Sequence, residues 1–381
     1  MLLQPFSADK SPTRIAGAAA TRRFDIETAR PLSNQEIYSR IEPSVVDVTS
    51  TLRYDDETAS GTGFIINSHA ALVLTNNHVI RDATSVTVTI PATDQSYQAH
   101  IIGVDVAADV AVLQINAPGL TQAPIGDSAR VATGTRVVSF GNRAGAGGSP
   151  AVASGIVSGT GRTIQASDSA SGFTETLHGM LQTTAKIEPG DSGGPLVNAS
   201  GAVIGVDTAA GTGGTATGYA IPIDTAMSAE RQIREGTPAA SIFLGVQGFL
   251  GVMLPQLSDK SPQSLQSQEK LEHVRSTGAT GSTPPPVCAT TKADVGRPRA
   301  VAPASSGALV VGVLCGTGAA NAGIGAGDVI TAADGRRVSS PEALTAIVSG
   351  SPPGTLVSVT WVSTTGKSHK AKIRLDPAPA V

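Results

Sequence analysis

The chain has 381 residues, a formal net charge of −3 at pH 7 and two cysteines, Cys288 and Cys315. Its near-neutral charge, with no long run of one sign, excludes the electrostatic footprint of a nucleic-acid-binding protein. Two cysteines are too few for a disulfide framework or for a zinc site built from several thiolates. A single disulfide and two separate thiols both remain open, and the length indicates two compact domains.

The N-terminal segment carries no sustained hydrophobic period, and we expect residues 1–40 to form a flexible tail. Its first residues, MLLQPFSADKSPTR, lack the apolar segment of a signal peptide. Nowhere does the chain approach the roughly 20 consecutive apolar residues of a membrane-spanning helix.

Short apolar runs follow one another between residues 41 and 225, separated by Gly, Asn, Asp and Ser. The runs are rich in Val, Ile and Thr, which favour strands, and the 43 glycines of the chain suit tight turns. Many short strands at turn-punctuated intervals predict an all-β sandwich or a pair of barrels.

The pattern changes after this region. Residues 226–240 read as a helical linker that Gly236-Thr237-Pro238 ends. Residues 241–381 predict a small α+β domain, interrupted at about 255–306 by a polar, Pro-rich stretch that we expect to be a flexible insert. The whole chain is therefore predicted to be mainly β.

A candidate nucleophile lies in the run Gly-Asp-Ser-Gly-Gly-Pro-Leu at residues 190–196. Glycines beside Ser192 remove side-chain bulk and permit positive φ, so the backbone can approach a substrate closely. The amides of Gly190 and Ser192 can then point into one space and form an oxyanion hole for acyl transfer. Serine alone is a weak nucleophile and needs a neighbouring base.

The base and its orienting acid have few candidates. His78 follows the apolar run 72–74, so it lies at a strand end where a side chain can reach a cleft. Asp109 directly precedes the apolar run 110–113 and is the better choice for a buried carboxylate that holds the imidazole tautomer. Asp105 is the alternative acid. This chemistry requires no metal and no organic cofactor.

The pattern Gly-x-Ser-x-Gly also occurs at the nucleophile elbow of α/β-hydrolases. That elbow requires a helix directly after the serine, whereas here Pro195 and a strand-like run follow. The order His, Asp, Ser along the chain also differs from the order in that fold. A plain glycine-rich turn is the other alternative, which the presence of His78 and Asp109 disfavours.

These motifs resemble those of the HtrA/Deg family of trypsin-like serine proteases. The histidine motif is Thr-Asn-Asn-His-Val at residues 75–79, the aspartate motif is Asp-Val-Ala-Val-Leu at 109–113, and the serine motif is the run at 190–196. The branch that it most resembles is the actinobacterial, secreted PepA-like one with a single PDZ domain. The resemblance implies a trypsin-like double β-barrel protease domain followed by a small α+β PDZ-like domain.

The resemblance also places a primary specificity pocket around Lys186, Ile187 and Thr208. Ile187 and Thr208 imply a small, apolar pocket, whereas Lys186 stands where the family usually has a small residue. If its ammonium extends into water, the pocket keeps an aliphatic preference. If it points inward, it needs a counter-charge such as an acidic substrate side chain. Asp191 replaces the Asn that usually precedes the nucleophile.

In the PDZ-like domain, the run Phe243-Leu244-Gly245-Val246 resembles the loop whose amides hold a peptide's terminal carboxylate. A second copy, Phe-Leu-Gly-Val at 249–252, competes for the same role, and we favour the first. The alternative is a packing module without a ligand.

The predicted function is a serine endopeptidase that hydrolyses peptide bonds in unfolded or misfolded proteins, with a PDZ-like domain that binds peptide C-termini. A homo-oligomer is left open. The competing hypothesis is a PDZ-bearing chaperone or adaptor whose protease domain is idle. The resemblance implies a secreted or cell-envelope protein, whereas the visible N-terminus leaves a cytoplasmic location open.

Overall fold

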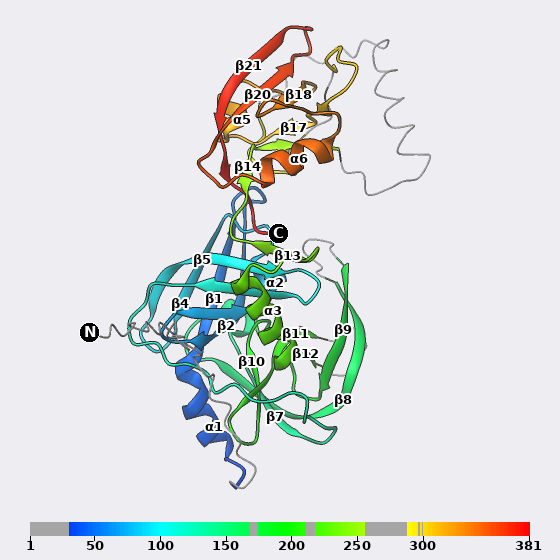
Figure 1. The fold of residues 1–381 in the computed structure, drawn as a ribbon. Coiled ribbons are helices and arrows are strands. Elements are labelled where there is room, and N and C mark those ends of the chain that lie inside the picture. The colour runs from blue at the N-terminus through cyan, green and yellow to red at the C-terminus, as the bar shows by residue number, and fades with distance from the viewer. Residues whose placement is uncertain (1–29, 168–173, 211–217, 256–287, 296–297, 299) are drawn as a thin grey trace, which may run out of the picture.

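The computed structural model describes residues 30–167, 174–210, 218–255, 288–295, 298 and 300–381. Two barrels lie together at the N-terminal side, and a smaller domain follows them (Figure 1). The expectation of a mainly β chain with a double-barrel domain and an α+β domain is confirmed. Within the described residues, no helix has the combination of length and apolar character that crossing a bilayer requires.

The first barrel is built from six strands in the order β5-β4-β1-β2-β3-β6, and pairing of β5 with β6 closes it. Strand β6 pairs with the second half of β5, from His100 to Asp105, whereas β4 pairs with the first half. A short helix, α2 (Asn77–Ile80), lies between β3 and β4. The strands are β1 (Val45–Leu52), β2 (Glu57–Asn67), β3 (Leu72–Thr75), β4 (Ser85–Ile90), β5 (Gln95–Asp105) and β6 (Val110–Gln114).

The second barrel is closed by six strands in the order β10-β11-β12-β9-β8-β7. Strands β8 and β9 form its longest hairpin and pair from Val157–Thr183 out to Ser167–Thr174. The strands are β7 (Arg136–Gly141), β8 (Ala151–Ser167), β9 (Thr174–Thr183), β10 (Pro195–Asn198), β11 (Val203–Ala210) and β12 (Gly218–Pro222).

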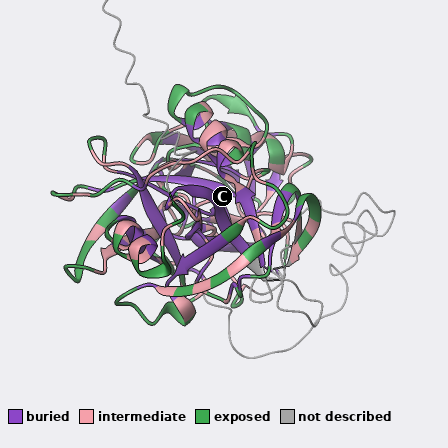
Figure 2. Cartoon of the chain, turned by 90° about the horizontal axis from the view of Figure 1, so that it is seen from below, coloured by how far each residue is buried: buried purple, intermediate pink, exposed green. Residues whose placement is uncertain are grey.

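Both barrels are filled by aliphatic side chains, and Figure 2 shows the buried residues gathered in the interior of the molecule. One buried cluster joins the two barrels, since it contains Phe64 and Leu74 from the first and Phe140 and Val206 from the second. The barrels therefore share a core, which fixes the interface at which the candidate site lies.

The segment at 34–41, expected to belong to a flexible tail, forms a helix that packs on this shared core. Helix α1 (Asn34–Ile41) starts at Ser33, whose side chain accepts from the Glu36 amide while the Glu36 carboxylate accepts from the Ser33 amide. This capping box stabilises the first turn. Ile37 and Ile41, four residues apart, are fully buried. The tail expectation is therefore wrong for these residues, and residues 1–29 lie outside the described part.

The expected linker at 226–240 also belongs to the protease core. Helix α3 (Ile223–Glu235) buries Ala226, Ala229 and Ile233 in the cluster shared by the barrels. Gly236 ends it with a φ of 65°, a left-handed conformation that glycine adopts without strain. The helix is correctly predicted, but its apolar stripe packs on the barrels rather than bridging two domains.

The smaller domain has its own core, which includes Leu250, Val310, Ile330 and Trp361. Its main sheet has the order β16-β18-β20-β21, with β19 paired to β18, and two small sheets pair β14 with β22 and β15 with β17. The elements are β14 (Gly248–Phe249), β15 (Val252–Met253), β16 (Ala308–Leu309), β17 (Gly312–Val313), α5 (Gly318–Asn321), β18 (Val329–Ala333), β19 (Arg336–Arg337), α6 (Pro341–Ser349), β20 (Leu356–Val362), β21 (Ser368–Arg374) and β22 (Asp376–Pro377).

The end of the expected insert is attached to both domains. Cys288 forms a disulfide with Cys315, which decides between the two possibilities that the sequence left open. Lys292 makes ion pairs with Asp55 at 3.1 Å and Asp82 at 2.6 Å in the first barrel. Residues 256–287, 296–297 and 299 lie outside the described part, and with them lies most of the stretch at 255–306 that the sequence predicts to be a flexible insert.

The last residues of the chain return to the first barrel. The Ala380 carbonyl accepts from the Asp82 amide at 2.8 Å, and the Ala380 amide donates to the Ala83 carbonyl at 2.9 Å. The Ala378 amide donates to the Gln247 carbonyl. The C-terminal segment thus links the smaller domain to the turn that follows α2, and the C-terminus lies near β13 in Figure 1.

Candidate active site

His78 and Asp109 are brought together by neighbouring strands of the first barrel. Strand β3 pairs with β6 up to Thr75↔Ala111, so α2, which follows β3 and carries His78, lies beside the turn that carries Asp109 directly before β6. The His78 amide donates to Asp109 Oδ1 at 2.9 Å, and His78 Nδ1 lies 2.8 Å from Asp109 Oδ2. The Asn76 side chain donates to the Asp109 carbonyl at 3.0 Å and fixes the same turn.

Asp109 occupies an unusual backbone conformation, with a φ of +52°. Asp is one of the few residues that adopt this region at modest cost, and strained backbone of this kind is concentrated at functional sites. The side chain is fully buried. Burial alone raises the pKa of the Asp109 carboxyl, but the neighbouring His78 charge and the bonds from His78 and Thr208 outweigh it and hold that pKa below its usual value.

The alternative acid, Asp105, serves a different purpose. Its Oδ1 accepts from the amides of Ala107 at 3.1 Å and Ala108 at 3.3 Å, so the carboxylate closes the turn between β5 and β6. The structure places Asp109, and not Asp105, in hydrogen-bond contact with His78.

Thr208 of β11 links the two barrels at this point. Its hydroxyl donates to Asp109 Oδ2 at 2.7 Å, and its carbonyl accepts from the Ser192 hydroxyl at 2.8 Å. One residue of the second barrel therefore contacts both the acid and the nucleophile candidate. The sequence placed Thr208 only in a specificity pocket. Its bond to the acid could not be predicted, because it depends on how the barrels pack.

Ser192 lies on the loop between β9 and β10, and this loop is held against the first barrel. The Thr62 amide donates to the Ser192 carbonyl at 2.8 Å, and the Thr62 hydroxyl donates to the Gly190 carbonyl at 2.7 Å. The Ala144 amide donates to the Pro189 carbonyl at 2.7 Å from a second loop. Nothing in the sequence context of Thr62 signals these two bonds, because they join segments far apart in the chain.

Glycine is required on both sides of the serine because the chain is too close to its neighbours for a side chain. A Cβ on Gly193, whose φ is +87°, would lie 2.0 Å from the Thr62 carbonyl oxygen. Gly190 has a φ of +94°. The amides of Gly190 and Ser192 donate to no group in the part of the chain that the structure describes. Both predicted oxyanion donors are thus available.

Charged side chains surround the same loop. Arg143 Nε lies 2.5 Å from Glu188 Oε2, and its terminal nitrogen lies 3.4 Å from Asp191 Oδ2. Lys186 pairs with Glu188 on the other side, and 66% of the Lys186 side chain is exposed. Burial raises the pKa of the Asp191 carboxyl, and the Glu188 amide and Arg143 offset this only partly. Because it is mostly exposed and pairs with Glu188, the Lys186 ammonium points toward solvent and an acidic neighbour.

The other residues predicted for the specificity pocket lie close to the nucleophile loop. Ile187 is buried, and a Cβ on Gly218 would lie 2.6 Å from the Ile187 Cδ1 atom. Thr208 is buried on the strand that pairs with the one bearing Gly218. Ile187, on the serine loop, and Thr208, on β11, are thus both buried, whereas the Lys186 side chain is mostly exposed.

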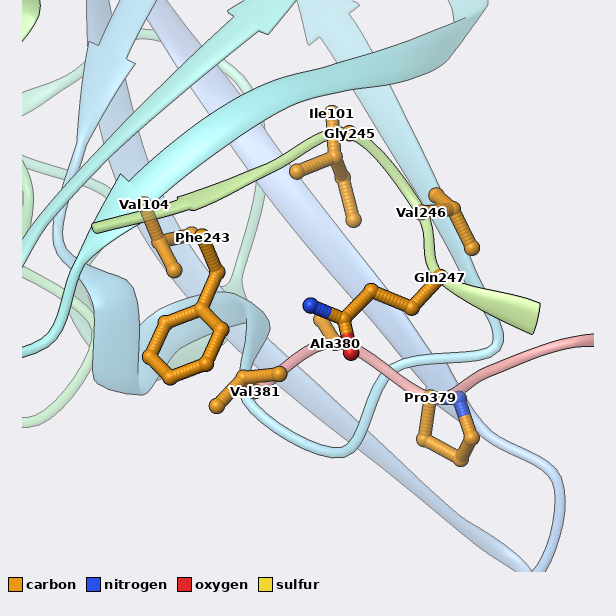
Figure 3. A pocket seen from close by; sticks show the side chains of 9 residues that line it. All are labelled: Ile101, Val104, Phe243, Gly245, Val246, Gln247, Pro379, Ala380 and Val381. Carbon is orange, nitrogen blue, oxygen red and sulfur yellow. The ribbon is translucent and has the colours of Figure 1, made fainter. Parts of the chain in front are cut away.

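The predicted carboxylate-binding run at Phe243–Val246 requires a correction. Strand β13 (Ile242–Leu244) pairs with β5 of the first barrel in the register Phe243↔Val104, so this segment does not open the smaller domain. Phe243, Gly245 and Val246 instead line a small pocket that also contacts Val381 (Figure 3). The competing copy at 249–252 does lie in the smaller domain, where Leu250 is part of its core.

The local pattern could not separate the two copies. Both read Phe-Leu-Gly-Val, and the structure pairs the first one with Gly103–Asp105, in the part of β5 that β4 leaves unpaired.

The two barrels, with a histidine and a buried aspartate on one and a glycine-flanked serine on the other, define a trypsin-like serine peptidase fold. A trypsin-like peptidase domain model matches residues 61–206, and a PDZ domain model matches residues 263–375. The chain belongs to the HtrA/Deg family of serine proteases with a PDZ domain.

Curated relatives are named accordingly. The putative serine protease HhoA of Synechocystis sp. is 33% identical over 291 residues, which are 76% of this chain and 63% of the relative. The periplasmic pH-dependent serine endoprotease DegQ of Escherichia coli is 32% identical over 321 residues, 83% of this chain and 59% of the relative. The serine protease PepD of Mycobacterium tuberculosis is 29% identical over 381 residues, 95% of this chain and 70% of the relative.

The chain thus spans 63% and 59% of the lengths of HhoA and DegQ, the first two of these relatives. A solved structure of the HtrA-type protease AlgW with a tripeptide is 28% identical, covers 91% of this chain and 99% of its own, and has a TM-score of 0.47.

Proposed function

We propose that the chain is a serine endopeptidase in which Ser192 is the nucleophile, His78 the general base and Asp109 the residue that orients the base. The observation that carries this proposal is the connected set of bonds from His78 to Asp109, from Thr208 to Asp109, and from Ser192 to Thr208. A buried carboxylate on Nδ1 fixes the tautomer in which Nε2 is free to accept a proton.

The reaction follows from these positions. The Ser192 hydroxyl, which donates to the Thr208 carbonyl at rest, rotates toward His78 when a substrate carbonyl arrives. His78 takes its proton as Ser192 Oγ bonds to the carbonyl carbon, and the proton then passes to the leaving amine. Water hydrolyses the acyl-enzyme by the same steps in reverse. The free amides of Gly190 and Ser192 stabilise the oxyanion in both tetrahedral intermediates.

The substrates that we propose are unfolded or partly folded proteins, whose extended segments can enter the site between the barrels. The buried Ile187 and Thr208 favour a small aliphatic side chain before the cleaved bond, with Lys186 directed outward to Glu188. We propose a secreted or cell-envelope location, because disulfides such as Cys288–Cys315 persist mainly in oxidising compartments. Relatives named as periplasmic agree with this location.

For the smaller domain we propose binding of peptide C-termini by the loop at 249–252. The amides of Leu250 and Gly251 donate to no group within the described residues, so they are available to a carboxylate. Gly251 has a φ of +86°, and a Cβ there would lie 2.1 Å from the Thr317 hydroxyl oxygen. We propose that the protease domain extends from about residue 30 through β13, and that the PDZ domain begins at β14.

A binding protein with an idle protease domain is the competing function. Reaction of the full chain with a serine-directed fluorophosphonate, and cleavage of unfolded casein, separate the two. Ser192→Ala should abolish labelling and lower proteolysis by about 10⁴-fold or more, because nucleophile and base act as a unit. Ser96→Ala, an exposed serine on β5, is the matched control and should leave both unchanged. Casein cleavage that survives Ser192→Ala would contradict the assignment.

A further inference from the structure

A second carboxylate lies beside His78, and it comes from the opposite barrel. One ring nitrogen of His78 and one carboxylate oxygen each of Asp109 and Glu175 all lie within 4.8 Å of one another. Glu175 lies on β9, in the outer part of the β8–β9 hairpin, where it pairs with Ala166. In Figure 1 this hairpin extends beyond the second barrel. The endopeptidase mechanism proposed above does not use Glu175.

Partial burial of Glu175 and His78 limits how far solvent screens the Glu175 charge from the imidazole. Glu175 is half-buried, and its Oε2 atom is shielded from solvent. About a quarter of the His78 side chain is exposed, at 23%, so water weakens the field of its neighbours only partly. The charged groups that face the imidazole are Asp109 from the turn before β6, Glu175 from β9, and Arg81 from the residue that follows α2.

These groups and the burial of the ring have opposite effects on the pKa of His78. Burial of His78 and the nearby Arg81 lower its pKa, while the charge and hydrogen bond of Asp109 and the charge of Glu175 raise it. The raising effects prevail, so the pKa of His78 lies above its usual value. The Ser192 hydroxyl meanwhile donates to Thr208, and no hydrogen bond joins it to His78 among the described residues. Among the described residues, the imidazole is therefore hydrogen-bonded to Asp109, with Glu175 nearby, and not to the nucleophile.

We propose that Glu175 is a positioning residue of the active site, whose carboxylate stabilises the protonated form of His78 from the opposite barrel, so that the neutral form that can act as a base is reached only at a higher pH. The proton that leaves His78 goes to solvent, and the neutral imidazole can then accept a hydrogen bond from the Ser192 hydroxyl. This inference rests on the proposed endopeptidase function. It assigns to the β8–β9 hairpin a direct electrostatic contribution to the pH range in which the protease works.

The experiment is the pH dependence of kcat/KM for a short neutral peptide, with the full chain. Removal of one carboxylate at this distance should move the acid limb to lower pH by about one unit in Glu175→Gln. Glu175→Asp, which keeps the charge, should leave the limb near that of the unaltered protein. Glu57→Gln removes an equal charge from an exposed position on β2 and should not move it.

A merely structural role would lower the rate at all pH values without moving the limb, and that result would overturn the proposal. A second measurement needs no variant: in the unaltered protein the limb should move to lower pH between 0.02 and 0.5 M salt, by roughly a few tenths of a unit, because the half-exposed Glu175 is screened more than the buried Asp109. A limb that is indifferent to salt would also contradict it. Failure of fluorophosphonate labelling at Ser192 would refute the endopeptidase function instead, so the two failures are distinguishable.

Discussion

The two barrels hold their parts of the site in different ways. In the first barrel, His78 lies on α2 just after β3 and Asp109 lies directly before β6, so the pairing of β3 with β6 brings them together. In the second barrel, Ser192 lies on a loop held by bonds outside any ladder, from Thr62, from Ala144 and from the ion pair of Arg143 with Glu188. The acid and base are thus fixed by the sheet, while the nucleophile and its oxyanion amides depend on contacts between loops.

The largest effect is expected for Asp109, in the first barrel's part of the site. Asp109→Asn keeps the shape but holds the wrong imidazole tautomer, and should lower turnover by about 10⁴-fold. Asp105→Asn should have a mild effect, because Asp105 only accepts from the Ala107 and Ala108 amides. The measurement is kcat for casein or a peptide in both variants. If Asp105→Asn proved the more damaging, the choice of Asp109 as the orienting acid would be wrong.

The link between the halves should have the next largest effect. Thr208→Val removes the hydroxyl that donates to Asp109 Oδ2 at 2.7 Å while keeping the side-chain volume. A hydrogen bond to a charged group contributes about 1.5–3 kcal/mol, so kcat/KM should fall by roughly 10- to 100-fold. Thr208→Ser retains the hydroxyl and should stay within a few-fold of the unaltered protein. Equal losses in both variants would show that packing, rather than this bond, matters.

Asp47 sharpens the comparison, because it is a residue of the first barrel's sheet whose ionisation lowers the stability of the fold. It is buried on β1, and burial raises its pKa to about 6. A raised carboxyl pKa means that the folded state holds the proton more tightly, so this group costs stability as the pH rises from about 4 through 6. Asp47→Asn should therefore stabilise by about 1–3 kcal/mol at pH 7.5 and have little effect at pH 4.

Thermal unfolding of Asp47→Asn at these two pH values, beside Asp94→Asn as an exposed control in a turn, measures the effect. A gain in Tm of the same size at both pH values would rule out ionisation of Asp47 as its cause.

The smallest effect is expected at the edge of the nucleophile loop. Lys186 is two-thirds exposed and pairs with Glu188, so Lys186→Ala should leave the side-chain preference aliphatic and the rate within about threefold. Cleavage-site profiling with a peptide library measures this. Enrichment of Asp or Glu before the cleaved bond, lost in Lys186→Ala, would show instead that the ammonium turns inward to the substrate.

The sequence predicted what local pattern encodes. The dense short strands, the positions of His78 after one apolar run and Asp109 before another, and the glycines around Ser192 each have a local signature. The strand pattern left a sandwich and a pair of barrels open, and the resemblance of the motifs to a known family implied the double barrel that the structure shows. Helix α1 could also have been predicted from the sequence, since Ser33 and Glu36 form a capping box before Ile37 and Ile41.

Other features depend on the packing of distant segments. The hydrogen bond of Thr208 to Asp109 and the proximity of Glu175 to His78 both cross from one barrel to the other, over 99 residues in the case of Thr208. The first Phe-Leu-Gly-Val run pairs with β5, a contact between distant segments that its local sequence does not signal, and the spacing of Cys288 and Cys315 does not reveal whether they pair.

The returning C-terminal segment complicates any dissection of this protein by truncation. A shortened chain that ends before the PDZ domain loses Ala380 as well, and with it both hydrogen bonds to Asp82 and Ala83, only four and five residues beyond His78. It also loses the ion pairs that Lys292 makes with Asp55 and Asp82. Weak proteolysis in such a fragment would therefore not show that peptide capture activates the enzyme, whereas a substitution confined to the loop at 249–252 would leave those supports in place.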